Sequence, residues 1–517
     1  MRTLVFHGYL LRGTGSNIYN ASLAKALVKL GHEVHLLCQD RGARELDFVD
    51  AVGRWEEGRL RVEIVREPVR CTAYLPDIGG LLPVYVADDY EGFRAVRFAD
   101  LGDDELDRYL EANVSAVREV AERSDADVAL ANHLVMGPAI MARAVGGRVP
   151  YAVKVHGSAL EYTVRPEPER FLPFARDGLE QASAVLVGSR HTAESLWEVM
   201  GDPGLPDRTR LGPPGVDADT FVPREPEEAA ERLRALADRL EGASGGWGGD
   251  AGASAALRAL DPTRERIVGY VGKLLVSKGV DLLLAAWPLV WTRARDARLV
   301  IIGFGTYRDG LERLTRGLAN GDVDDARDIA RRGRELEGGP PGELTYLSAF
   351  LDAIGPDYID AAKGAFERVH WTGRLEHDDL PDLLPSFLAQ VVPSTFPEAF
   401  GMVAVEAAAC GALPLSAAHS GLAEVTRQLR EAVGDEVKPL LSFERAPGAI
   451  NEIAEKLSEW LSMPPDERDR ARASLSEEAR RRFGWEGVAR GVIAAAEGRL
   501  DELPRPATDE PSRRGSG

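Results

Sequence analysis

The chain has 517 residues, more than a single hydrophobic core supports, and a hydrophobic content of 44%, so we expect two packed domains. Its 63 basic and 83 acidic residues give a formal net charge of -20. Because this charge repels phosphate backbones and anionic lipid, it excludes nucleic acid as the expected partner.

Short apolar runs alternate with longer amphipathic stretches in the first part of the chain. This alternation is typical of βαβ units with a mainly parallel sheet. We therefore predict an acceptor-side, Rossmann-like first domain over residues 1–214. Its predicted strands are residues 3–6, 34–37, 60–65, 128–131, 151–155 and 184–187.

A glycine-rich turn, Gly-Thr-Gly-Ser-Asn at 13–17, follows the first predicted strand and leads into a predicted helix over 18–30. Backbone N–H groups in such a turn can bind an anion, which makes Gly15 a candidate phosphate contact, although similar turns occur in α/β folds without a ligand. His7 and His156 end predicted strands, where open α/β sheets place ligands. A neutral His156 could bond a sugar hydroxyl, or only cap its strand.

Residues 212–215, Gly-Pro-Pro-Gly, have the composition of a hinge, and we place the domain boundary at Pro214. The second domain is expected over 215–484. At its start, residues 225–262 combine a charged helical stretch with a run rich in Gly, Ser and Ala, so we predict a flexible segment there.

A second series of apolar runs predicts a second doubly wound domain. A charged region over 306–368 contains Gly-Gly-Pro-Pro-Gly and is too long for a simple βα connection, so we predict a helical insertion. The tail over 503–517 is rich in Pro, Arg, Ser and Gly and is predicted to be disordered. The predicted strands are residues 267–271, 299–302, 369–372, 390–392 and 413–416.

Two lysines, Lys273 and Lys278, lie five residues apart in a loop after the first strand of this series. Two ammonium groups directed at one spot repel each other unless an anion lies between them, and a pyrophosphate would satisfy both. Taken alone, the segment is equally compatible with two solvated surface lysines.

The most specific segment is 393–411, where a buried strand leads through Pro-Glu-Ala-Phe-Gly into a helix that Gly411 ends. Glu398 belongs to the turn at the helix start and can accept hydrogen bonds from a hexose. Glu406 lies about one turn into the helix and can hold a ribose diol. The loop amides can bind hydroxyl and phosphate groups. The residues we assign to donor binding here are Glu398, Ala399, Phe400, Gly401, Met402, Val403 and Glu406.

From the first glycine-rich turn to about Trp485, apart from the charged region over 306–368, the sequence resembles glycosyltransferase family 4. The resemblance implies the GT-B fold, an α/β class with two facing Rossmann-like, doubly wound domains and a cleft between them. It also implies a helix, here about 485–500, that crosses back to the first domain. Three features depart from the family pattern. Lys273 stands where Arg is usual, which removes a bidentate donor, and Pro214 stands where Asn is usual. The loop at 13–17 is Gly-Thr-Gly-Ser-Asn in place of a plain double glycine.

The resemblance also implies residue roles. Glu398 would contact the donor hexose, Glu406 the ribose, and Lys273 with Lys278 the diphosphate. It matches His156 to a histidine near the transferred sugar and Gly15 to a backbone contact with phosphate. The residues expected to carry catalysis are His156, Lys273, Lys278 and Glu398.

These features predict a retaining glycosyltransferase that moves a hexose from a nucleotide-diphosphate sugar, with UDP-glucose favoured, to a hydroxyl of a sugar, lipid-linked or small-molecule acceptor. Donors based on GDP-mannose or ADP-glucose stay open, as do a nucleotide-sugar epimerase and a catalytically silent sugar-nucleotide-binding protein. No cofactor and no metal are expected, because Asp-Val-Asp at 322–324 lies in the charged region and not at the end of a clear strand.

Cys38, Cys71 and Cys410 are far apart and show no metal-ligand spacing, which suits a reducing cytoplasm. The amino terminus has no secretory pattern. The longest apolar run, 282–291, is about half a membrane span and contains Pro288, so no transmembrane segment is expected.

Overall fold

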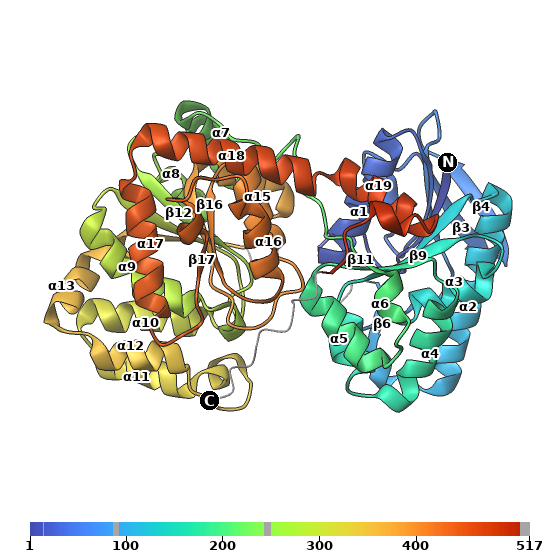
Figure 1. Ribbon diagram of the computed structural model, residues 1–517, viewed down its shortest axis with the longest axis horizontal. Coiled ribbons are helices and arrows are strands. Elements are labelled where there is room, and N and C mark those ends of the chain that lie inside the picture. The colour runs from blue at the N-terminus through green and yellow to red at the C-terminus, as the bar shows by residue number, and fades with distance from the viewer. Residues whose placement is uncertain (14, 86–91, 242–249, 507–517) are drawn as a thin grey trace. The chain divides into compact units, whose positions relative to one another are not determined.

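The computed structural model describes residues 1–13, 15–85, 92–241 and 250–506. The chain forms two compact units (Figure 1). Unit 1 comprises Met1–Gly215 and the part of the chain from Gly484 onward, and unit 2 comprises Val216–Phe483. Both units contain a mainly parallel sheet covered by helices, which confirms the predicted α/β class.

Unit 1 contains a nine-stranded sheet with the strand order β11-β10-β9-β8-β1-β2-β5-β3-β4. Alternate residues of β1 belong to different cores, since Leu4 and Phe6 pack with helices α2, α3 and α4 while Val5 packs with α1 and α19. Helices therefore cover both faces of the sheet. The strands are β1 Arg2–Phe6, β2 Glu33–Leu37, β3 Ala51–Glu56, β4 Arg59–Ile64, β5 Cys71–Leu75, β8 Val128–Asn132, β9 Tyr151–Val155, β10 Ala184–Val187 and β11 Thr209–Leu211.

Two features of this sheet differ from the prediction. The run at 60–65 is not part of a parallel βαβ unit, because β4 pairs antiparallel with β3 in a hairpin at the sheet edge. Residues 71–75, which were not among the predicted strands, form the buried strand β5, which pairs with β2 and β3. A small separate sheet pairs β6 Leu81–Val84 with β7 Arg94–Arg97.

The helices of unit 1 include α19 Trp485–Ala496, which lies beside α1 although the two are far apart in sequence (Figure 1). The chain remains attached to this unit after α19, since the Leu211 N–H donates to the carbonyl of Pro504 at 2.8 Å. The start of the tail predicted to be disordered is therefore bound, and 507–517 lie outside the described residues. The other helices are α1 Gly15–Lys29, α2 Asp103–Ser124, α3 Gly137–Val145, α4 Pro168–Glu180, α5 Arg190–Met200 and α6 Leu205–Arg208.

Unit 2 contains a six-stranded sheet, with the order β14-β13-β12-β15-β16-β17, in which all pairs are parallel. Because parallel strands end at the same edge, the loops after β12 and β15 lie close together. Among the described residues, no helix combines the length and apolar character that a membrane crossing requires. The strands are β12 Arg266–Val271, β13 Ala297–Ile302, β14 Val369–Gly373, β15 Phe387–Val392, β16 Leu413–Ala417 and β17 Ser442–Phe443.

Helices fill two regions of unit 2 that were predicted as a flexible segment and an insertion. Within 225–262, α7 buries Leu233 and Leu236 in the core, and α8 follows, while 242–249 lie outside the described residues. Within 306–368, α10 to α13 contribute to the same core. The helices of unit 2 are α7 Pro226–Glu241, α8 Ala253–Arg258, α9 Val280–Arg293, α10 Arg308–Asn320, α11 Val323–Arg332, α12 Thr345–Ala353, α13 Pro356–Ala365, α14 Leu380–Leu383, α15 Met402–Ala409, α16 Ser420–Arg430, α17 Ala449–Ser462 and α18 Pro465–Phe483.

Candidate functional site

In unit 1, a buried chain of hydrogen bonds connects the carboxyl ends of β1, β8 and β9. His7 Nδ1 lies 3.0 Å from the Asn20 amide nitrogen, and Asn20 bonds Asn132 in turn. Asn132 Oδ1 lies 2.8 Å from His156 Nε2. The two histidines predicted at strand ends are thus members of one network, and sequence patterns did not indicate the two asparagines that join them.

His156 is held in the neutral form. Burial lowers its pKa well below the usual range, and the neighbouring His133, Lys154 and His7 lower it further. Because Asn132 Oδ1 accepts the bond from Nε2–H, Nδ1 is the acceptor nitrogen of the ring. A neutral imidazole with one acceptor nitrogen can receive a hydrogen bond from a hydroxyl group.

His133 is packed among aromatic rings at this strand edge. Its ring lies 4.8 Å from that of Tyr85 and 4.9 Å from that of His156, and its backbone φ is +70°. Neither ring nitrogen has a hydrogen-bond partner within the described ranges, and burial lowers its pKa well below the usual value. No motif in the sequence indicates this residue.

The glycine-rich turn after β1 is described apart from Thr14. Gly15 is the first residue of α1, so its N–H has no partner within the helix. Asn17 is buried, and its side chain bonds both His7 Nε2, at 3.0 Å, and the Arg12 carbonyl, at 2.7 Å. Asn17 therefore fixes the turn to β1.

In unit 2, the loop after β12 and the loop after β15 meet through an ion pair. Lys278 Nζ donates to Glu398 Oε1, and Ser394 Oγ donates to the same oxygen at 2.6 Å. The side chains of Lys278 and Glu398 are 31% and 23% exposed, so both are accessible to a ligand. The structure thus brings together two of the predicted site residues.

Helix α16 fixes the backbone of the loop that carries Glu398. The Glu398 N–H donates to Ser420 Oγ at 2.9 Å, and the Gly421 N–H donates to the Glu398 carbonyl at 2.9 Å. After this loop, α15 begins at Met402, so the N–H groups of Met402 and Val403 have no partners within the helix. An anion can bind at such a helix start.

Glu406, in the second turn of α15, is 3% exposed, and its Oε1 lies 2.9 Å from His377 Nε2. The ring of His377 packs on Phe221 with a centroid distance of 5.4 Å. Burial lowers the pKa of His377, but the bond to Glu406 outweighs it, and the pKa is raised overall. His377 positions Glu406, and its only sequence signal is its place after a strand.

Lys273 is exposed, and its carbonyl accepts a bond from the Tyr270 hydroxyl at 2.8 Å. Its loop packs on a second glycine turn, after β13, that was not predicted from the sequence. A side chain at Gly303 would lie 1.8 Å from the Gly272 carbonyl oxygen, and one at Gly305 would lie 2.3 Å from the Leu274 carbonyl oxygen. Only glycine permits these two contacts. The sequence feature that could have indicated the turn is Gly-x-Gly directly after a strand.

Asp322, in the Asp-Val-Asp sequence, accepts a bond from the Asp325 N–H at 3.0 Å and caps α11. Asp324 pairs with Arg327. These carboxylates stabilise a helix start.

Comparison with known proteins links both units to one kind of enzyme. The model of the glycosyl transferase 4-like domain matches residues 14–215, and models of glycosyl transferases group 1 match residues 265–332 and 358–482. The D-inositol 3-phosphate glycosyltransferase of Xylanimonas cellulosilytica is 25% identical over 93% of this chain and 90% of its own length. The enzyme of the same name from Frankia alni is 26% identical over 71% of this chain and 73% of its own length.

Solved structures show the same fold at low sequence identity. Sucrose-phosphate synthase from Thermosynechococcus elongatus is 17% identical with a TM-score of 0.53, and covers 97% of this chain and 99% of its own. HepE from Anabaena, in complex with UDP and glucose, is 16% identical with a TM-score of 0.54, and covers 96% of this chain and 99% of its own.

Proposed function

The chain belongs to the GT-B glycosyltransferases, which take nucleotide-sugar donors, and we propose that it is a retaining, metal-independent hexosyltransferase. Its first unit is family 4-like and its second unit matches group 1. UDP-glucose is the proposed donor and a hydroxyl group the acceptor.

The observation that carries this proposal is the contact of Lys278 with Ser394 and Glu398 in the loop that leads into α15. Glu406 is buried in the same helix. Glu398 accepts hydrogen bonds from the hexose. The N–H groups of the loop and of the first turn of α15 bind phosphate oxygens. Glu406, held by His377, accepts both hydroxyls of the ribose.

The reaction breaks the bond between the anomeric carbon and the diphosphate oxygen, and the electron pair leaves with the diphosphate. Lys278 and Lys273 stabilise the negative charge on this leaving group. The acceptor oxygen attacks the anomeric carbon on the same face, and its proton passes to the departing phosphate. No residue forms a covalent intermediate. His156, through Nδ1, accepts a hydrogen bond from a sugar hydroxyl.

The names of related proteins rank the substrates to test. HepE has been solved with UDP-glucose, which supports UDP-glucose as the first donor, and starch synthase IV with ADP and acarbose, which makes ADP-glucose the second. GDP-mannose is the third. The curated relatives named D-inositol 3-phosphate glycosyltransferase make a phosphorylated cyclitol the first acceptor.

The test measures nucleoside diphosphate release from each donor, with and without inositol phosphate. We expect release only with the acceptor, and a loss of about 100-fold or more in kcat for Glu398→Gln. Glu459→Gln, which changes an exposed carboxylate on α17, is the matched control. Release without any acceptor would favour an epimerase or hydrolase, and donor binding without turnover a sensor. Wild-type kcat in Glu398→Gln would overturn the site.

A further inference from the structure

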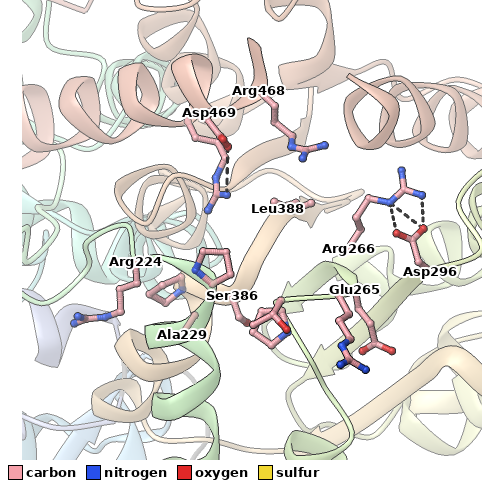
Figure 2. Close-up of a pocket in the computed structure, with 15 residues that line it drawn as sticks. Arg224, Ala229, Glu265, Arg266, Asp296, Ser386, Leu388, Arg468 and Asp469 are labelled. Carbon is pink, nitrogen blue, oxygen red and sulfur yellow. Dashed lines mark hydrogen bonds and ion pairs between the residues drawn. The ribbon is translucent and has the colours of Figure 1, made fainter. Parts of the chain in front are cut away.

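A crevice of about 360 Å³ lies in unit 2, away from the loops that carry Lys278 and Glu398 (Figure 2). Arg266 begins β12, Ser386 precedes β15 and Asp296 precedes β13, so the crevice is at the amino edge of the sheet. The proposed donor loops are at the carboxyl edge. The crevice is therefore a separate feature of the same unit.

Arginine dominates the charge of this crevice in a chain that is acidic overall. Five arginines and three acidic residues line it. Two of the three carboxylates are already paired, since Asp296 bonds Arg266 and Glu265 lies 2.6 Å from Arg298. The third, Asp469, has a side chain that is 66% exposed and forms only a long ion pair with Arg472. Among the arginines, Arg224 and Arg264 pair with Glu228 and Asp261 outside the lining, so the surplus of positive charge remains on α18.

The surplus is concentrated on Arg468 and Arg472, one turn apart on α18. Arg468 donates to the Leu461 carbonyl at 3.2 Å, and Arg472 donates to the Gly411 carbonyl at 2.9 Å. Within the described part of the unit, neither guanidinium makes a hydrogen bond to a carboxylate, and the buried Nε of Arg468 has no partner. Arg472 Nη1 and Asp469 Oδ1 form only a long ion pair, at 3.9 Å.

Two like charges at this helical spacing repel each other, and both side chains are partly buried. The Arg472 side chain is only 17% exposed. Burial lowers the pKa of both arginines, and the charge of Arg468 lowers that of Arg472 further. A bound anion would remove this unfavourable arrangement.

We propose that the crevice binds a phosphorylated small molecule, with its phosphate group between Arg468 and Arg472. Guanidinium groups match the oxygens of a phosphate bidentately. The volume is sufficient for a sugar phosphate, since small-molecule sites begin at about 300 Å³. In Figure 2, Arg468 and Asp469 lie on one side of the crevice, and Ala229 and Ser386 on the other. The remaining space between them takes the rest of the ligand.

The same two turns of α18 hold the carboxyl end of α15. Arg472 bonds the Gly411 carbonyl, and Ser476 Oγ donates to the Ala409 carbonyl at 2.7 Å. The amino end of α15 follows the loop of Glu398. An anion that draws Arg472 away from Gly411 therefore acts on the donor helix, and we expect it to change the KM for the donor. This regulatory consequence rests on the proposed function, whereas anion binding does not.

The experiment uses the full chain saturated with UDP, so that the donor site is occupied. Glucose 6-phosphate is titrated in, with sulfate as a comparison anion, and binding is followed by calorimetry and by the thermal unfolding midpoint. We expect saturable binding that is at least about tenfold weaker in Arg468→Gln and in Arg472→Gln. Arg470→Gln, on the same helix but exposed, should bind like the wild type.

Arg472→Gln also removes the bond to Gly411 and can impair folding. The test is therefore decided by Arg468→Gln, with Arg468→Lys as the conservative substitution at the same position. Equal, millimolar affinity for sulfate and glucose 6-phosphate in all variants would mean an adventitious ion only and would overturn the proposal. If UDP fails to bind but glucose 6-phosphate binding still depends on Arg468, the proposed function fails and the crevice site stands.

Discussion

The imidazole of His377 is held by the buried carboxylate of Glu406 and the ring of Phe221. Its pKa in the folded protein is raised above that of the unfolded chain, so the pair stabilises unit 2 fully below about pH 6.5. This contribution is lost as pH rises through the folded pKa. We expect His377→Gln to lower the free energy of unfolding by about 1–2 kcal/mol at pH 6 and by less at pH 9, measured by urea denaturation.

His191→Gln is the control for this pH dependence, because His191 is exposed on α5 in the other unit. Its effect on the unfolding of unit 2 should be small at both pH values. An equal loss of stability at pH 6 and pH 9 in His377→Gln would show that the protonated ring is not what stabilises Glu406.

At the scale of single residues, the sequence alone identified those residues that belong to a recognisable motif. Lys278 and Glu398 are in contact, and both were placed at a donor site from their local sequence. The residues that support this site were not predicted, since Ser420 begins α16 and His377 follows β14. Only the folded sheet brings Ser420 to Glu398 and His377 to Glu406. The roles of all these residues in binding stay predictions until they are mutated.

At the scale of helices and strands, α16 fixes the position of the loop that carries Glu398 through a contact that only glycine allows. A Cβ at Gly421 would lie 2.4 Å from Phe400 Cα and 2.5 Å from its carbonyl oxygen, both backbone atoms. Gly421→Ala must therefore push the loop of Glu398 away from α16. We expect donor affinity, measured by calorimetry, to fall about tenfold or more, with a loss of about 1–3 kcal/mol in stability.

Gly448→Ala provides the matched control, because a Cβ at Gly448, directly before α17, meets no atom within 4 Å. It should change neither donor affinity nor stability appreciably. If Gly421→Ala binds the donor as tightly as the wild type, the position of this loop does not determine donor binding.

The strands also show what a sequence pattern can predict. The apolar runs at 267–271 and 299–302 are both buried strands in the interior of the sheet. Because such strands are buried on two faces, their residues form a continuous apolar run that can be recognised in the sequence. The hairpin of β3 and β4 was not predicted as such, because β4 is largely exposed at the sheet edge and lacks a continuous apolar run. Strand β5 contains Cys, Thr and Tyr, so its sequence does not show that it is buried. Its burial results from its place between β2 and β3 in the sheet.

For the whole molecule, the chain length predicted two domains and the alternating apolar runs predicted their α/β class, but neither could predict that unit 1 uses both ends of the chain. The apolar face of α19 indicates a buried helix without indicating where it packs, and only the family resemblance suggested its return to the first domain. In the structure its Trp485 ring lies 5.4 Å from that of Tyr19. Long-range assembly of this kind depends on the complete core.

The carboxyl-terminal segment should therefore be needed for the stability of unit 1. Ending the chain after Phe483 removes Trp485, Val492 and Ile493 from the core, and it deprives the buried guanidinium of Arg210 of its bond to the Leu500 carbonyl. We expect the unfolding free energy of unit 1 to fall by at least about 4 kcal/mol, while unit 2 keeps its own calorimetric transition. Ending the chain after residue 506 retains these contacts and should leave both transitions in place. A chain ending at Phe483 that still unfolds unit 1 at the wild-type temperature would show that α19 adds little to this core.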